Sequence, residues 1–298
     1  MQRRQFIVQT SLTAGALTIA NNSLLAHLFA DPWKIKMLSE QVGIFTEKGG
    51  TIAFLITEEG IVVVDAQFPE QSKHLIGELK NRSAKPIRLL INTHHHGDHT
   101  AGNIEFKNIV QHVIGHENCL INQKRVAEEQ KTTDKQLFAD VTFSGTWKTS
   151  IGGEKIKAHY LGAGHTNGDA IIHFQNANIV HMGDLVFNRR YAFVDRSAGA
   201  SIASWIDILD KAKNMFDTDT LFIFGHAFDP TKVTGGVNDL SAMQHYLARM
   251  LRFVDSEIRA GKSKEEILKS KAIPGVPEWK GDGIERGLQA AYEELTLS

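Results

Sequence analysis

The chain has 298 residues, of which 42% are hydrophobic and 22% are charged, and its formal net charge is -1. This balance gives no support for a general nucleic-acid binder or for a protein that binds anionic membrane surfaces, since both usually carry a basic excess. The single cysteine, Cys119, excludes an internal disulfide and a cysteine-based zinc knuckle.

The first 30 residues are typical of a targeting segment rather than of a folded domain. Arg3 and Arg4 precede a short, weakly apolar run from Leu12 to Ala20, which is the pattern of a bacterial twin-arginine export signal. The alternative is a disordered or amphipathic N-terminal arm. We expect residues 1–30 to direct export to the periplasm. No later apolar run reaches the ~18 residues of a membrane-spanning helix, so we expect no integral membrane association.

Strands dominate the next part of the chain. Ile52, Phe54 and Ile56 alternate with other residues, and the apolar run 61–64 predicts a strand covered on both faces. Pro69 predicts the start of a helix. Further strands are expected at 87–91, 109–114, 155–161, 170–174, 178–182 and 221–224, with a polar helix after 114 and another helix from about 201 to 216.

The last part of the chain is helical in pattern. Apolar residues recur at three- and four-residue spacing from Leu240 to Ile258, and Ser263 with Glu266 forms a capping box for the following helix. A strand-rich part followed by helices predicts an α/β domain over residues 31–235. A C-terminal helical extension, residues 236–298, would pack on that domain.

A dense group of potential metal ligands follows the predicted strand at 87–91. Four of them fall within six positions, namely His94, His96, Asp98 and His99. Side chains at i and i+2 of an extended segment point to the same side, and Gly97 gives the loop freedom to turn the later pair toward a second point. Imidazole nitrogen and carboxylate oxygen are ligands that zinc accepts without thiolates. A solvated loop or an expression tag fits poorly with a position directly after a buried strand.

The segment resembles the His-x-His-x-Asp-His signature of the metallo-β-lactamase superfamily. Later segments match the pattern of the family in the expected order, with GHTNGD at 164–169, GDLVF at 183–187 and GH at 225–226. An early strand ending at Asp65 also fits. The resemblance implies a four-layer αββα sandwich, two sheets packed face to face with helices outside and a metal site on loops along one edge.

By this resemblance, seven side chains would hold two zinc ions, with iron or manganese as possible substitutes. The first ion would be bound by His94, His96 and His165, the second by Asp98, His99 and His226, and Asp184 would bridge the two. Asp65 and Thr93 would orient ligands or fix loops. The other histidines near the motif or in strands, which are His95, His173 and His181, are expected to be structural.

The resemblance also implies a hydrolase for a small-molecule substrate. A hydroxide shared by two zinc ions would attack an ester, lactone or related acyl bond, and Asp98 would orient the nucleophile and steady the leaving group. Lactamases of the superfamily usually have Cys or Ser at the position of Asp184, whereas glyoxalase-type thioesterases and many acyl-homoserine lactonases have Asp. We therefore expect ester-like or lactone hydrolysis to exceed β-lactam hydrolysis.

Other functions stay open from the sequence. A β-lactamase and an iron-dependent redox member of the superfamily are compatible with the ligand set. A nuclease would be expected to show a basic surface, and open coordination positions argue against a non-enzymatic metal-binding module.

Substrate recognition is expected from the loop after Asp184. A guanidinium in this loop could pair with a substrate carboxylate or phosphate. The alternative is that the arginines are solvated or support a neighbouring loop. The candidate substrate-binding residues are Asn188, Arg189, Arg190 and Tyr191.

Overall fold

The computed structural model describes residues 32–297. The fold lies in the compact unit that begins at Ile35. The predicted export signal, residues 1–30, lies outside the described residues. No helix within residues 32–297 is long and apolar enough to cross a membrane.

The first sheet has seven strands, which are neighbours in chain order. Strands β2 to β4 are antiparallel, and β4 to β7 are parallel. In the register, Val64 at the end of β4 lies beside Ile91 at the end of β5, so the loops that follow these strands begin at the same edge of the sheet. The strands are β1 (Lys34–Met37), β2 (Val42–Thr46), β3 (Ile52–Thr57), β4 (Gly60–Val64), β5 (Ile87–Ile91), β6 (Val110–His116) and β7 (Val141–Phe143).

The second sheet has six strands in the order β15-β13-β11-β10-β9-β8. Within it β11 and β13 are parallel, so the loops that carry Asp184 and His226 both leave the same edge. A separate two-stranded pair, β12 and β14, joins Phe187 to His226. The bounds are β8 (Thr146–Ile151), β9 (Glu154–His159), β10 (Ile171–Phe174), β11 (Ile179–His181), β12 (Phe187–Asn188), β13 (Leu221–Ile223), β14 (His226–Ala227) and β15 (Thr234–Gly235).

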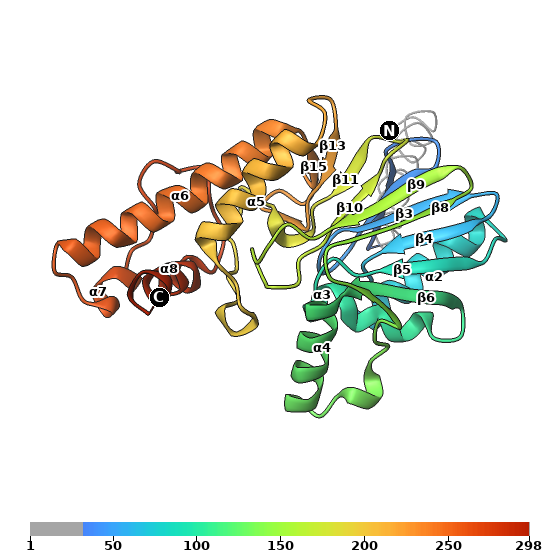
Figure 1. The fold of residues 1–298 in the computed structure, drawn as a ribbon, viewed down its shortest axis with the longest axis horizontal. Helices are drawn as coiled ribbons and strands as arrows, with labels where there is room; N and C mark the ends of the chain where they lie inside the picture. The colour runs from blue at the N-terminus through green and yellow to red at the C-terminus, as the bar shows by residue number, and fades with distance from the viewer. Residues whose placement is uncertain (1–31, 298) are drawn as a thin grey trace, which may run out of the picture. The chain divides into compact units, whose positions relative to one another are not determined.

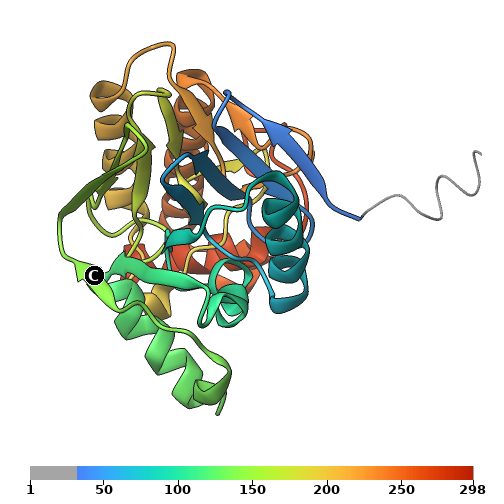
Figure 2. The ribbon, with the colours of Figure 1, turned by 90° about the vertical axis from the view of Figure 1, so that its right-hand side faces the viewer.

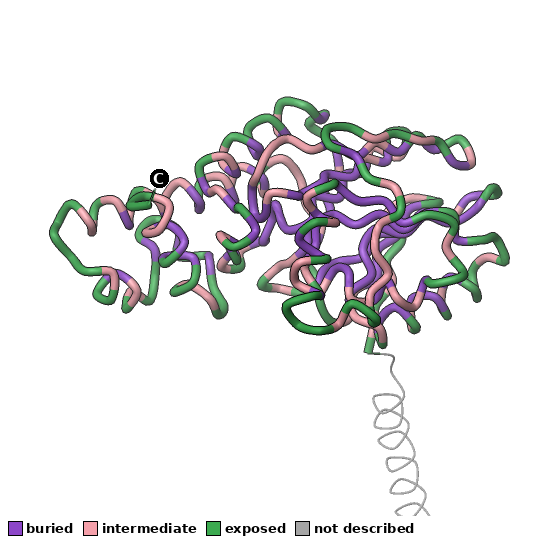
Figure 3. The backbone as a smooth tube through the Cα atoms, turned by 60° about the horizontal axis from the view of Figure 1, so that its bottom comes forward, coloured by how far each residue is buried: buried purple, intermediate pink, exposed green. Residues whose placement is uncertain are grey.

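The two sheets pack face to face, with helices on both outer sides (Figures 1 and 2). One apolar core lies between the sheets and includes Val62, Ile91, Ile156 and Ile172. The buried segments concentrate in these central strands, while the helices expose their outer faces (Figure 3). The helices are α2 (Pro69–Arg82), α3 (Gly97–Thr100), α4 (Glu117–Glu129) and α5 (Ile202–Met215), with α6 to α8 near the C-terminus. This arrangement confirms the predicted αββα sandwich.

The C-terminal helices share a second apolar core with the second sheet and α5. The apolar stripe of α6 (Val237–Arg259) buries Leu240, Met243 and Leu247 in this core, together with Trp205 of α5. The predicted capping box of α7 (Lys264–Leu268) is confirmed, because Ser263 and Glu266 bond each other's backbone N–H. The domain boundary at 235/236 stays a prediction.

Several short strands were not predicted, and neither were the bounds of β8 or of α8 within the predicted helical extension. Strand β8 alternates exposed polar residues, which is the pattern of a strand at the edge of a sheet. Helix α8 (Ile284–Thr296) is amphipathic and buries Leu288, Ala290 and Ala291 on one face. Its Glu294 carboxylate accepts hydrogen bonds from the N–H groups of Ile202 and Ala203 at 2.8 and 2.9 Å, which caps the N-terminus of α5.

Candidate metal centre

The seven predicted metal ligands converge at one edge of the sandwich. They come from loops or short elements that follow strands β5, β9, β11 and β13. Because the parallel strands within each sheet end at the same edge, residues far apart in the chain meet there. These seven side chains form two groups that could each hold a metal ion, namely His94, His96, His165 and Asp184, and Asp98, His99 and His226.

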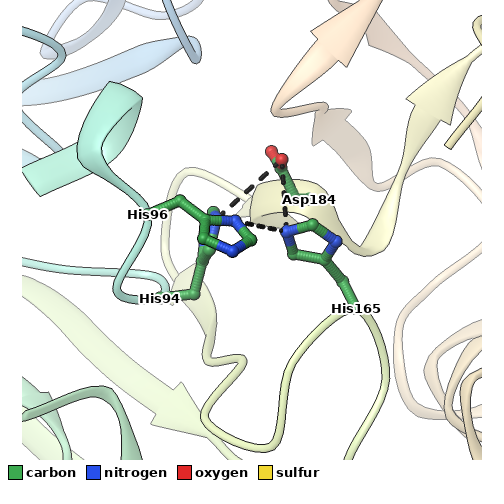
Figure 4. A group of neighbouring side chains, drawn as sticks. All are labelled: His94, His96, His165 and Asp184. Atoms are coloured by element: carbon green, nitrogen blue, oxygen red, sulfur yellow. Dashed lines mark hydrogen bonds and ion pairs between the residues drawn. The ribbon is translucent and has the colours of Figure 1, made fainter. Parts of the chain in front are cut away.

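In the first group three imidazoles face one another (Figure 4). The Nδ1 atom of His96 lies 3.1 Å from Nε2 of His94 and 2.8 Å from Nε2 of His165. Burial and the neighbouring His96 lower the pKa of His165 to about 3, and burial with His99 lowers the pKa of His94 well below its usual value. Neutral imidazoles present lone pairs, which is the state that a metal ion requires.

The second group combines two imidazoles with a carboxylate. The Nε2 atom of His226 lies 3.0 Å from Oδ2 of Asp98, and His99 Nε2 lies 3.9 Å from the same oxygen. Burial opposes the charged form of His226, but the carboxylates of Asp184 and Asp98 outweigh it and raise the pKa of His226 to about 9. Burial would raise the pKa of Asp98, but the neighbouring His99 and His226 lower it to about 2.

Asp184 lies between the two groups. One of its oxygens, Oδ2, is 3.5 Å from Nε2 of His165 and 3.4 Å from Nε2 of His226. Its other oxygen, Oδ1, is 3.0 Å from Nε2 of His99. A single carboxylate therefore reaches nitrogen donors of both groups.

The site fits divalent cations with nitrogen and oxygen ligands. Within residues 32–297, Nε2 of His99 and Oδ1 of Asp184 are buried without a hydrogen-bond partner although they face each other. Leaving such atoms unpaired costs about 1–3 kcal/mol each, and a bound cation would remove that cost. Neither group contains sulfur, because Cys119 is buried in α4 and belongs to neither of them.

Two glycines make room for these ligands. A Cβ atom added to Gly225 would overlap Oδ1 of Asp184, and one added to Gly50 would overlap the ring of His99. Gly50 lies in a loop of the first sheet, and Gly225 lies in a loop of the second sheet. Close approach of the backbone to the ligands therefore requires glycine at both.

Asp65 orients the second group from behind. Its carboxylate accepts hydrogen bonds from Thr93 N at 2.8 Å, from Thr93 Oγ1 at 2.7 Å and from His99 Nδ1 at 2.7 Å. Asp65 is fully buried and has a left-handed φ of 67°. By binding Nδ1, it leaves Nε2 of His99 to face Asp184, which agrees with the predicted orienting role.

The sequence did not reveal the partners that orient the first group. Oδ2 of Asp195 accepts a hydrogen bond from His96 Nε2 at 2.9 Å, and the carbonyl of Phe193 accepts one from His165 Nδ1 at 2.7 Å. Asp195 is 99 positions from His96 along the chain. Its local sequence indicates only a capping residue, and its Oδ1 does accept a hydrogen bond from Ala198 N in the next turn. No spacing rule connects such pairs.

The remaining histidines lie outside the two groups. His181 donates from Nε2 to the Thr51 carbonyl and accepts from Gly183 N, which is the predicted structural role. His173 is half-buried in β10. His95 points to the far side of His96, where its Nε2 lies 3.7 Å from Asp195, and burial with His96 lowers the pKa of His95 to about 3. His95, His96 and Asp195 form a third group whose spacing could hold a metal ion.

The four predicted substrate-binding residues have different surroundings. Asn188 donates to the carbonyl of Lys232 at 2.9 Å, and Arg189 lies 3.5 Å from Asp239 with its guanidinium over a tryptophan ring. These contacts tie the loop after Asp184 to Lys232, to α6 and to Trp279. Arg190 is exposed and Tyr191 is half-buried, and both line a cavity beside Phe187.

Comparison with known proteins identifies related sequences. The family model described as the metallo-beta-lactamase superfamily matches residues 46–226. The chain is 26% identical over 190 residues to metallo-beta-lactamase IND-1 of Chryseobacterium indologenes, covering 62% of this chain and 75% of that protein. It is 28% identical over 162 residues to the 2,4-dinitroanisole O-demethylase subunit alpha of Nocardioides sp. (strain JS1661), covering 52% of this chain and 48% of that protein.

Solved structures share the fold. A metallo-beta-lactamase from Pontibacter korlensis superposes with a TM-score of 0.61 at 21% identity, covering 72% of this chain and 99% of that one. A double mutant of the sec-alkyl sulfatase PisA1 gives 0.70 at 13% identity, covering 88% of this chain and 50% of that one. The sulfatase likeness thus extends over more of this chain than the lactamase likeness does.

Proposed function

Because the chain belongs to the metallo-β-lactamase superfamily, we propose that it is a dinuclear zinc hydrolase that cleaves an ester, lactone or related acyl bond. The observation that carries the proposal is the position of Asp184 between two sets of nitrogen donors, 3.5 Å from His165 and 3.0 Å from His99. A carboxylate shared in this way suits two adjacent cations.

The ions would be held by His94, His96 and His165 on one side and by Asp98, His99 and His226 on the other, with Asp184 shared. When bound, such ions lower the pKa of coordinated water and polarise a carbonyl oxygen. The chain provides the orientation. Asp195, Phe193 O and Asp65 each bind the outer nitrogen of an imidazole, and so direct His96, His165 and His99 into the site.

We assign Asp98 the role of the carboxylate nearest the reacting groups. Its side chain is 31% exposed, whereas that of Asp184 is 4% exposed, so Asp98 is the more accessible acceptor for a proton. It accepts a hydrogen bond from Nε2 of His226 through Oδ2, which leaves Oδ1 as the atom that would receive a proton.

The acidic side chains of the site favour an oxygen leaving group. Asp98 and Asp184 both face histidine nitrogens and are held as carboxylates, so the proton for a leaving group would have to be the one that Asp98 receives during the reaction. The nitrogen of an amide usually needs such a proton when it leaves, whereas the oxygen of an ester or lactone is the better leaving group. This supports ester or lactone substrates over β-lactams.

Metal analysis of protein purified without added metal is the first test. About two zinc ions per chain are expected for a shared-carboxylate site. His96→Ala and His165→Ala should each lose metal and activity together, whereas His112→Ala, at an exposed position of β6, should keep both. Two retained metals and full turnover in either ligand variant would refute the assignment, and iron in place of zinc would favour a redox member of the superfamily.

A substrate panel then separates the hydrolase classes. The kcat/KM values for lactones, aryl esters and thioesters should exceed those for penicillin, cephalosporin and carbapenem substrates. β-Lactamase activity is the second candidate, favoured by the relatives named metallo-beta-lactamase. A hundredfold preference for a β-lactam, ~2.7 kcal/mol of transition-state binding, would establish that second function instead.

We also propose that residues 1–30 are an export signal and that the catalytic domain spans residues 31–235. Residues 236–298 would be a helical extension of this domain. The paired arginines support the first proposal. The shared core of α6 and α5 supports the description of the extension as packed on the domain.

A further inference from the structure

Two arginines from distant parts of the chain line one small cavity beside the metal centre. Arg190 lies in the loop after Asp184, and Arg286 lies on α8. The cavity has a volume of about 60 Å³, and Phe187 and Phe193 also line it. A space of this size suits a small charged group rather than a whole substrate.

The two phenylalanines connect this cavity to the metal ligands. The ring of Phe187 stacks on His226, with centroids 5.3 Å apart, and the ring of Phe193 lies 5.4 Å from that of His96. Both rings also approach His165, at 5.5 and 5.9 Å. A group bound in the cavity is therefore separated from the ligands by one aromatic ring.

Arg190 and Arg286 differ from the other arginines of this region. Arg189 is paired with Asp239, and Arg196 with Glu294. By contrast, within residues 32–297 no ion pair is formed by Arg190 or Arg286, both of which are exposed. Asp282 is the acidic residue that lines the cavity, so two positive charges face one negative charge.

Apolar surface adjoins these charges. Phe193 is 37% exposed and carries the guanidinium of Arg286 over its ring at 5.5 Å. Phe228 is 50% exposed. It lies near Arg190, because a Cβ atom placed on Gly281 would be 3.6 Å from the Phe228 side chain and 3.8 Å from that of Arg190. A larger cleft of about 340 Å³ shares Phe193 and Arg286 with the small cavity. Cations next to exposed aromatic rings suit a ligand that is both anionic and apolar.

The two arginines are held near each other by the backbone. Lys280, just before α8, donates its N–H to the carbonyl of Arg189 at 3.0 Å, and its own carbonyl accepts from Tyr191 N at 3.0 Å. These bonds join the segment before α8 to both sides of Arg190. The position of Arg286 relative to Arg190 is therefore part of the fold.

We propose that Arg190 and Arg286 form an anion-binding subsite, the arginine subsite, for substrates whose apolar body carries a sulfonate, carboxylate or phosphate group. This proposal rests on the proposed hydrolase function and names its substrate class. It gives the C-terminal extension a direct part in recognition, because Arg286 belongs to that extension.

A binding measurement tests the subsite independently of turnover. Zinc-loaded protein is titrated calorimetrically with 4-phenylbutane-1-sulfonate and with the uncharged 4-phenylbutan-1-ol. The sulfonate should bind more tightly, and Arg190→Gln and Arg286→Gln should each weaken its binding by about threefold or more, as expected for partly exposed charge pairs. Arg286→Lys keeps the charge and should retain part of the affinity. The matched control is Arg252→Gln, an exposed arginine on α6.

Two results would overturn the subsite. Either unchanged sulfonate binding in both glutamine variants, or an equal loss in the Arg252→Gln control, would show that these arginines do not recognise the anion. A second measurement compares kcat/KM for 4-acetoxybenzenesulfonate with that for phenyl acetate, and the ratio should fall in both variants. If the unaltered protein hydrolyses no lactone, ester or thioester of the substrate panel while arginine-dependent sulfonate binding persists, the hydrolase proposal fails and the subsite stands.

Discussion

Replacing Asp65 with Asn isolates the orienting hydrogen bond of one metal ligand. Asn tolerates the left-handed φ of 67° at this position, so the substitution adds little backbone strain. The Asn carbonyl can still accept from Thr93 N. The amide group, however, would direct an N–H toward Nδ1 of His99, where the carboxylate now accepts a hydrogen bond at 2.7 Å.

The expected loss follows from this donor–donor conflict. His99 would have to move its proton to Nε2, the atom that faces Asp184, or leave a buried N–H unpaired at a cost of about 1–3 kcal/mol. Loss of such an outer partner typically lowers metal affinity about 10- to 100-fold, which is ~1.4–2.7 kcal/mol. We expect the ion at the second group to be lost first, because His99 belongs to that group.

Competition with a zinc-binding indicator at pH 7 measures this affinity. The matched control is Asp140→Asn, since Asp140 accepts from His112 Nδ1 at 2.9 Å and from Val113 N, but is exposed and outside both groups. Equal affinity for both ions in Asp65→Asn and the unaltered protein would refute the reasoning. So would an equal decrease in the Asp140→Asn control.

Three further predictions concern the site, the pH dependence and export. Gly225→Ala should lose metal and activity because its methyl group overlaps a ligand oxygen, whereas Gly145→Ala, with nothing within 4 Å of the added atom, should keep both in metal analysis. Burial and Lys157 lower the pKa of His159 from 6.5 to about 4. Between these pH values the unfolded chain binds a proton that the folded chain does not, so stability falls by up to about 3 kcal/mol as the pH falls. Denaturant unfolding of His159→Gln at pH 7 and pH 5 should show a smaller decrease, and an unchanged decrease would contradict this assignment. Changing the arginine pair at positions 3 and 4 to lysine should leave unprocessed precursor in the cytoplasm, and normal export on fractionation would exclude the twin-arginine route.

The sequence alone was sufficient to predict the strands next to the metal centre and the residues that converge there. Continuous apolar runs such as 61–64 and 87–91 predict buried strands, because a strand covered on both faces excludes polar side chains. His94, His96, Asp98 and His99 follow the second of these runs closely, so local pattern and chemistry are enough to find them. His165, Asp184 and His226 were predicted through the resemblance to the metallo-β-lactamase superfamily. Local pattern is also enough for α6, whose apolar residues recur at three- and four-residue spacing from Leu240 to Val254.

The partners of the ligands depended on the tertiary structure. Asp195 contacts His96 although the two are 99 positions apart in the chain. Arg286 lies over the ring of Phe193 because α8 packs against the loop that contains Phe193. Helix α8 is itself amphipathic, but its sequence pattern does not show which loop it packs against. Such contacts are fixed by how sheets and helices pack in three dimensions. Hydrogen-bond partners and cavity walls need only be close in space, so their separation along the chain carries no periodic signal.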